Sequence, residues 1–188
     1  MAALESYQLL LVDGNLGDAI LTAEMLGQGG SLGRFCVSRA ATFADAAKRV
    51  SRARYDAVLL DLILPDLEGL EAVKAMLTIA PDVPLVVLSG LDDERLALEA
   101  VLTGAQDYLI KGQGNAALLR RAIRHAIERK RIERELSQLA KFDPLTGLPN
   151  RLLFRDRLAQ AVQRIDRREH VVALIFIDLD GFKAVNDR

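Results

Sequence analysis

The sequence predicts an α/β protein built on a five-stranded parallel sheet that is doubly wound, with helices on both faces. Two observations lead to this prediction. Short apolar segments alternate five times with segments of helical spacing, and this alternation is typical of a parallel sheet covered by helices. The segment Ala57–Leu60 is also an unbroken apolar run, which is the pattern of a strand buried on both faces.

The order of these segments defines the predicted elements. The strands, in chain order, are Gln8–Asp13, Arg34–Ala40, Ala57–Asp61, Pro84–Ser89 and Gln106–Lys111. The helices predicted to follow them are Asp18–Leu26, Thr42–Arg52, Leu70–Ala80, Asp93–Thr103 and Asn115–Lys141.

Local signals support these boundaries. The first helical segment ends near Gly27, and the strand after it has the weakest pattern of the five. Thr42 is the predicted N-cap of the second helix, with Asp45 three residues later, where a capping box has Glu or Gln. Pro65 and Gly69 break the chain between the third strand and its helix.

The composition is that of an ordinary globular protein. The 188 residues are 51% apolar and 27% charged, and a net charge of -1 gives no general attraction to nucleic acid or to an anionic membrane. No apolar run approaches the roughly 18 residues that span a bilayer, and MAALESYQ lacks the features of a signal peptide. The one cysteine, Cys36, has the apolar neighbours of a buried strand residue. We therefore expect a cytoplasmic protein with neither nucleic acid nor membrane as a partner.

Four polar residues stand at the ends of predicted strands, namely Asp13, Asp61, Ser89 and Lys111. These ends meet at one edge of a parallel sheet, where ligands bind in open α/β folds. Two carboxylates can hold Mg²⁺, and a carboxylate can accept a phosphoryl group whose oxygens contact the hydroxyl and the ammonium. Each residue alone is also explained as a turn, capping or strand-end residue, but the set of four favours a phosphoryl-transfer site.

The motifs around these residues resemble the response-regulator receiver domain over about residues 7–136. The matching segments are LLVDGN, DLILPDLEGLE, LSG and TGAQDYLIKG. The resemblance implies a flavodoxin-like fold, Mg²⁺ as cofactor, and a histidine kinase or phosphotransfer protein as phosphodonor. By position it implies that Asp61 is the phosphoacceptor, that Asp13, Asp61 and the backbone carbonyl of Ile63 hold Mg²⁺, that Ser89 and Tyr108 are switch residues, and that Lys111 contacts the phosphate.

One position departs from the family pattern. The family usually has two adjacent acids after the first strand, and here the second is Gly14. Because that acid is expected to contact the metal directly, water must take its place or Mg²⁺ binds more weakly. Two interpretations stay open: a receiver that is phosphorylated, and a pseudo-receiver that dimerises or docks a partner without phosphorylation. The retained Asp13, Asp61, Ser89 and Lys111 favour the first.

The segment Asn115–Lys141 contains no Gly or Pro and predicts one helix of roughly 40 Å, longer than a receiver needs. Its apolar positions form a seam with a phase break near Lys130 and Arg131, which resembles a stutter in a coiled coil. The seam consists of Leu119, Ile123, Ala126, Ile127, Ile132, Leu136 and Leu139. The helix is basic, but acids at i,i+4 from its arginines and the absence of aromatic residues favour an ion-paired, solvated face. We interpret it as a coiled-coil linker and expect a homodimer, which forms either through this helix or through the region of the fourth helix.

Residues 142–188 predict the start of a second domain. DPLTGLPNR forms a turn before a predicted helix Arg151–Arg167, and VVALIFID predicts a buried strand Val171–Asp178. DPLTGLPNR and DLDGFKAVND resemble the opening of the GGDEF domain of diguanylate cyclases, an α+β domain. By that resemblance Asp178 and the backbone carbonyl of Leu179 would hold Mg²⁺, and Phe182, Lys183 and Asn186 would contact GTP.

We therefore expect a receiver core over residues 1–114, a linker helix over 115–141, and the N-terminal fragment of a GGDEF domain over 142–188. The functional expectation is a two-component response regulator. Phosphorylation at Asp61 changes its dimer geometry and controls an attached diguanylate cyclase, which joins two GTP molecules into cyclic di-GMP. The sequence stops before the GGDEF signature loop, so we expect this chain alone to be inactive as a cyclase. An incomplete sheet would also leave an edge prone to disorder or association.

Overall fold

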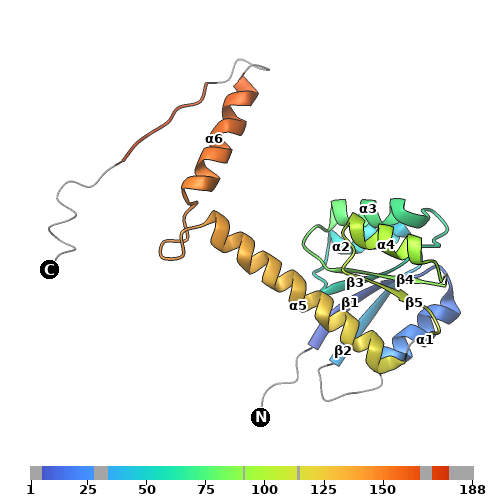
Figure 1. Ribbon diagram of the computed structural model, residues 1–188. Helices are drawn as coiled ribbons and strands as arrows, with labels where there is room; N and C mark the ends of the chain where they lie inside the picture. The colour runs from blue at the N-terminus through green and yellow to red at the C-terminus, as the bar shows by residue number, and fades with distance from the viewer. Residues whose placement is uncertain (1–5, 28–33, 91, 114, 166–170, 178–188) are drawn as a thin grey trace, which may run out of the picture. The chain divides into compact units, whose positions relative to one another are not determined.

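The computed structural model (Figure 1) describes residues 6–27, 34–90, 92–113, 115–165 and 171–177. The chain divides into two compact units, residues 1–134 and residues 135–188. The residues of the GGDEF motif from Asp178 onward lie outside the described part of the chain.

Five parallel strands form the centre of the first unit, in the spatial order β2-β1-β3-β4-β5. They are β1 Ser6–Val12, β2 Arg34–Ala40, β3 Ala57–Asp61, β4 Leu85–Ser89 and β5 Asp107–Ile110. Leu11 lies beside Leu59, and Leu59 beside Val86, so the carboxyl ends of neighbouring strands reach the same edge. This is the flavodoxin-like strand order, and it confirms the predicted fold class.

The helices of this unit are α1 Leu16–Gly27, α2 Phe43–Val50, α3 Gly69–Ile79, α4 Glu94–Thr103 and α5 Ala116–Lys141. Helices α2, α3 and α4 cover one face of the sheet, and α1 and the first half of α5 cover the other (Figure 1). Successive strand residues point to opposite faces of the sheet. Leu10 therefore packs against α2, α3 and α4, and Leu9 packs against α1 and α5. Because both faces are buried, the central strands β3 and β4 are apolar at every position before their last residues, Asp61 and Ser89.

Helix α2 is capped by two different segments. Thr42 is its N-cap, as predicted, and its hydroxyl accepts the Asp45 N–H at 3.1 Å. The Asp45 carboxylate pairs with Arg49 at 3.0 Å. The backbone N–H groups of Phe43 and Ala44 donate instead to Asp66, at 2.8 and 2.9 Å, from the loop after β3. Asp66, which is distant in sequence, therefore accepts hydrogen bonds from two backbone N–H groups of the first turn that the Thr42 cap does not satisfy.

Helix α5 changes its surroundings along its length. Leu119 and Ile123 are buried against the sheet, whereas Leu136 and Leu139 are 62% and 63% exposed. Between these parts, the Arg129 guanidinium donates to the Gln106 carbonyl at 2.6 Å, and Arg134 donates to the carbonyl of Asp82. None of the helices in the described ranges has a stretch that is both long and apolar enough to cross a membrane.

The second unit contains the last turns of α5, a turn, and helix α6 Arg151–Ile165. Asp143 organises the turn by accepting the N–H groups of Leu145 and Thr146, and Asn150 caps α6 by accepting the Leu153 N–H at 3.0 Å. The prediction of a helix after DPLTGLPNR is confirmed, with its described end at Ile165.

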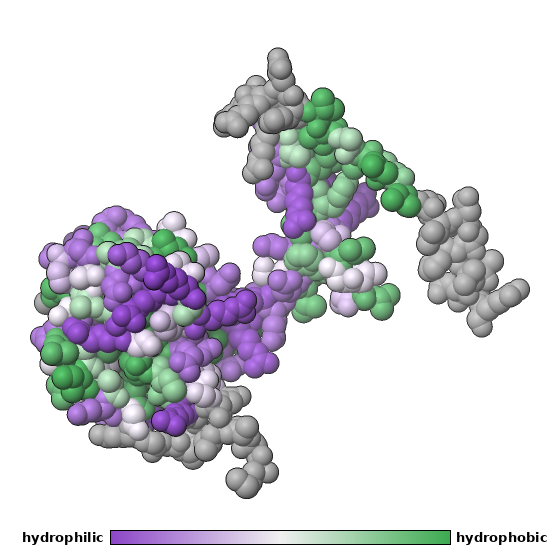
Figure 2. All heavy atoms as spheres, turned by 180° about the vertical axis from the view of Figure 1, so that it is seen from behind, coloured by the Kyte–Doolittle hydropathy of each residue, from purple (hydrophilic) through white to green (hydrophobic). Residues whose placement is uncertain are grey.

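The prediction of a buried strand over Val171–Asp178 is wrong for its described part. Residues 171–177 form no strand, and Phe176 and Ile177 are 85% and 88% exposed. Hydrophobic side chains gather on this segment and on α6 (Figure 2). A strand needs a hydrogen-bonding neighbour, and no described strand pairs with this segment. An apolar run alone therefore does not produce a ladder.

Candidate active site

The four residues predicted at strand ends come together at the carboxyl edge of the sheet. Asp13 directly follows β1, Asp61 ends β3, Ser89 ends β4 and Lys111 directly follows β5. The strand order reverses between β1 and β3, and in such sheets the crevice at this reversal is where ligands bind. Asp13, Asp61 and Ser89 are all buried. Buried polar groups at this edge indicate a binding or catalytic site formed by the strand ends.

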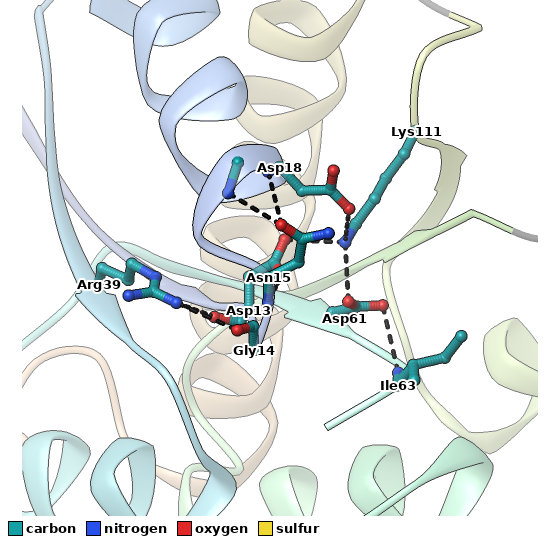
Figure 3. Close-up of polar contacts among 9 residues, drawn as sticks. Asp13, Gly14, Asn15, Asp18, Arg39, Asp61, Ile63 and Lys111 are labelled. Atoms are coloured by element: carbon teal, nitrogen blue, oxygen red, sulfur yellow. Dashed lines mark hydrogen bonds and ion pairs between the residues drawn. The ribbon is translucent and has the colours of Figure 1, made fainter. Parts of the chain in front are cut away.

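Lys111 connects the carboxylates of this edge (Figure 3). Its Nζ lies 2.8 Å from Asp13 Oδ2, 2.7 Å from Asp61 Oδ2 and 3.1 Å from Asp18 Oδ2. The backbone N–H of Lys111 donates to the backbone carbonyl of Ser89 at 2.7 Å, and this bond holds the Lys111 backbone beside β4. Asp18 is a member of the site that the sequence analysis missed, because its position in a helix gave no strand-end signal.

The carboxylates also accept backbone hydrogen bonds. Asp13 Oδ1 accepts the Asn15 N–H at 2.8 Å, and Asp61 Oδ1 accepts the Ile63 N–H at 3.2 Å. These bonds orient both carboxylates toward Lys111. The role of the Ile63 carbonyl as a metal ligand stays a prediction.

Two opposing effects shift the pKa values of Asp13 and Lys111: burial disfavours their charged forms, and their hydrogen bonds with one another favour them. Burial raises the pKa of the Asp13 carboxyl above its ordinary value, and the hydrogen bonds from Lys111 and the Asn15 N–H offset only part of that rise. For Lys111, burial alone would lower the ammonium pKa. The hydrogen bonds to Asp13, Asp61 and Asp18 together outweigh burial, so the Lys111 pKa is raised. Lys111 therefore stays charged and partly neutralises the acids around it.

Gly14 stands where the family usually has its second acid. A Cβ at this position would lie 3.0 Å from Cδ of Pro65, so the proline ring closes in on the place of the missing side chain. Arg39 donates from its guanidinium to the carbonyls of Asp13 and Gly14, at 2.9 and 3.4 Å (Figure 3). The sequence analysis missed Arg39, which reaches this backbone from the neighbouring strand β2.

The donor set fits Mg²⁺. Among the described residues, no group of three His, Cys, Asp or Glu side chains is arranged to hold a metal. Mg²⁺, however, is usually held by one or two carboxylates together with waters and phosphate oxygens. The buried Asp13 and Asp61 carboxylates supply such a pair, and Lys111 now lies between them.

The two predicted switch residues lie on adjacent strands. Ser89 is buried at the end of β4, and Tyr108 is half-buried on β5. Tyr108 and Lys111 both line a hollow of about 770 Å³ between α1, α4, β5 and α5. The predicted GGDEF residues Asp178, Leu179, Phe182, Lys183 and Asn186 lie outside the described residues, so their roles stay predictions.

Comparison with known proteins identifies the family of this chain. A family model described as a response regulator receiver domain matches residues 6–124, which is most of the chain. The chain belongs to the response regulator receiver family. A second model, described as the diguanylate cyclase GGDEF domain, matches residues 140–188. The receiver domain is therefore followed by a GGDEF segment in one chain, as the two resemblances implied.

Relatives support both parts. The bifunctional diguanylate cyclase/cyclic di-GMP phosphodiesterase MucR of Pseudomonas aeruginosa is 60% identical over 57 residues, which are 30% of this chain and 8% of MucR. The DNA-binding transcriptional activator DevR/DosR of Mycobacterium tuberculosis is 32% identical over 126 residues, covering 60% of this chain and 56% of that protein. The chain thus spans less than two thirds of either relative.

The receiver domain also shares its fold with solved structures. The signal receiver domain of a putative LuxO repressor protein from Vibrio parahaemolyticus superposes with a TM-score of 0.60 at 21% identity, over 70% of this chain and 97% of that one. At this identity the likeness concerns the fold, and it confirms the doubly wound receiver architecture.

Proposed function

We propose that this chain is the receiver part of a two-component response regulator, in which Asp61 accepts a phosphoryl group from a histidine kinase or phosphotransfer protein. The observation that carries the proposal is the contact of Lys111 with both Asp13 and Asp61 at the carboxyl edge of the sheet. This arrangement supports the proposal because it brings the carboxylates of Asp13 and Asp61 and the positive charge of Lys111 together.

The chemistry follows from these groups. An Asp61 carboxylate oxygen attacks the phosphorus of a phosphohistidine, the P–N bond breaks, a P–O bond forms, and the departing imidazole takes a proton from solvent. Asp61 Oδ2 now accepts a hydrogen bond from Lys111, so the ammonium shifts toward the incoming phosphoryl oxygens as the attack begins. Ser89 lies at the adjacent strand end, where its hydroxyl contacts a phosphoryl oxygen. Asp13 and Asp61 would hold Mg²⁺, which would supply further neutralisation of the phosphoryl charge.

The experiment that tests this proposal is intact-mass analysis after incubation with acetyl phosphate. We expect one phosphoryl adduct that requires Mg²⁺ and is lost in Asp61→Ala. The exposed Asp82→Ala variant is the matched control and should keep the adduct. Absence of an adduct on the folded wild-type chain would refute phosphorylation at this site.

The output of the switch is proposed to pass through α5. Phosphorylation would change the arrangement of a homodimer formed along this helix and so bring two GGDEF domains of the intact protein together, because cyclic di-GMP is made from two GTP molecules. The matched GGDEF model over residues 140–188 supports this output. That the chain alone makes no cyclic di-GMP stays a prediction, which incubation with GTP and chromatography of the products tests. A cytoplasmic location and the absence of a nucleic-acid partner also stay predictions.

A second candidate is the pseudo-receiver, which pairs without phosphorylation. Gly14 favours it, since Pro65 approaches the place of the missing acid and Arg39 adds a positive charge beside its backbone. Both features weaken the attraction of the site for Mg²⁺. The acetyl phosphate experiment separates the two candidates directly.

A further inference from the structure

Asp18 contacts the centre of the site from an element outside the set of strand ends. It lies in the first turn of α1, and its Oδ2 is 3.1 Å from the Lys111 ammonium. An ammonium has three N–H donors, and the three acceptors in reach here are the carboxylates of Asp13, Asp61 and Asp18. The Asp18 side chain is 40% exposed, whereas those of Asp13 and Asp61 are 0% and 7% exposed, so Asp18 holds Lys111 from the solvent side.

The charges near position 14 explain why such a residue matters. Gly14 contributes no carboxylate, and the guanidinium of Arg39 binds the carbonyls of Asp13 and Gly14. The site has therefore one negative charge fewer than the family pattern, and it has a positive group nearby. The Asp18 carboxylate faces the same ammonium as the two buried acids, so it adds negative charge where the divalent cation would enter.

We propose that Asp18 is a positioning residue of this site, whose carboxylate anchors Lys111 and supplies the negative charge that Gly14 lacks, so that Mg²⁺ binds to Asp13 and Asp61. The inference rests on the proposed function. When the Asp61 oxygen is released for attack, Asp18 keeps the ammonium close to the position where phosphoryl oxygens arrive. Asp18 itself touches neither the phosphoryl group nor the metal in this account.

The test measures binding of Mg²⁺ alone to the full chain, by NMR titration of the backbone amides of Asn15 and Ile63. Asp18→Asn keeps the size of the side chain and an oxygen acceptor but removes the charge. We expect its Mg²⁺ dissociation constant to rise roughly fivefold, the scale of one partly screened charge acting on a divalent ion. Asp18→Glu should restore binding to within about twofold of the wild type. Glu24→Gln, an exposed acid on the same helix, is the matched control and should leave binding unchanged.

A second measurement asks whether Asp18 replaces the missing acid. In Gly14→Asp, the Asp18→Asn change should weaken Mg²⁺ binding by less than about twofold, because a direct ligand is restored. In Gly14→Ala, which adds the same Cβ without a carboxylate, the roughly fivefold effect should persist. Three outcomes would each overturn the inference. The effect of Asp18→Asn could be equal in the two backgrounds, Asp18→Asn could bind Mg²⁺ as tightly as Glu24→Gln, or the wild-type chain could bind no Mg²⁺. Asp18-dependent Mg²⁺ binding without an Asp61 adduct would refute phosphorylation, and only the role of Asp18 in Mg²⁺ binding would stand.

Discussion

Lys111 carries the positive charge that joins three carboxylates of the active site. Its side chain is 14% exposed, and its ammonium lies within 3.1 Å of three carboxylates, of which Asp13 is fully buried. Removing one partner of a buried ion pair leaves the other desolvated and uncompensated. Without Lys111, the acids at this edge would repel one another until a cation replaced the ammonium.

The first prediction is that Lys111→Met lowers the free energy of unfolding by about 3 kcal/mol, the low end for breaking a buried ion pair. Addition of millimolar Mg²⁺ should recover part of the loss, because the cation compensates the same carboxylates. Urea unfolding with and without Mg²⁺ measures both effects. Lys74→Met, which removes an exposed pair with Glu71, is the control and should change stability little. A Lys111→Met chain as stable as the control would show that the acids need no cation.

At the scale of elements, the N-terminus of α2 depends on a side chain from another loop. Asp66 accepts hydrogen bonds from the N–H groups of Ala44 and Phe43, and these bonds hold the pKa of its carboxyl below the ordinary value of 3.8. A carboxyl whose pKa is lower in the folded state stabilises that state fully above its unfolded pKa. The contribution is lost as the pH falls through the folded pKa.

The second prediction concerns this pH dependence. Asp66→Asn should lower the melting temperature at neutral pH, because an amide is a weaker partner than a carboxylate for the positive end of a helix. The difference from the wild type should shrink as the pH approaches and passes below 3.8, where the wild-type carboxyl becomes protonated. Thermal melts followed by circular dichroism measure it, with Glu71→Gln on α3 as the exposed control. A difference that stays constant with pH would contradict the assigned cause.

The apolar seam of helix α5 is also divided by its surroundings into a buried part and an exposed part. The seam changes phase near Lys130. Before this point Leu119, Ile123 and Ala126 face the sheet, and after it Leu136 and Leu139 are exposed. The phase break therefore separates an intramolecular contact from a free stripe, consisting of Ile132, Leu136 and Leu139. Such a stripe on a helix is suited to pairing with a second copy.

At the scale of the whole molecule, the third prediction tests the homodimer. Leu136→Asp should weaken self-association at least about tenfold, because burying a leucine contributes about 1.5–3 kcal/mol and a charge in its place opposes pairing. Sedimentation velocity over a range of protein concentrations measures the change. His125→Asp, an exposed change in the first half of the same helix, is the control. A monomeric wild-type chain would refute the homodimer, and a variant that dimerises normally would place the interface elsewhere.

Sequence reasoning captured most of the fold because its signals are local. The five strands were predictable from apolar runs such as Ala57–Leu60, and the convergence of Asp13, Asp61, Ser89 and Lys111 followed from strand direction alone. The segment Val171–Ile177 has an equally strong apolar pattern, yet its residues form no strand. Strand propensity becomes structure only when a neighbouring strand accepts and donates the ladder hydrogen bonds.

The sequence by itself therefore determined the α/β class, the edge at which the site forms and the residues that end the strands. Only the tertiary structure decided that Asp18 anchors Lys111, that Arg39 binds the backbone of Gly14, and that Asp66 caps α2. The physical reason is range. Propensity and periodicity depend on residues within a few positions of one another, whereas these contacts join residues 22 or more positions apart through the packing of separate elements.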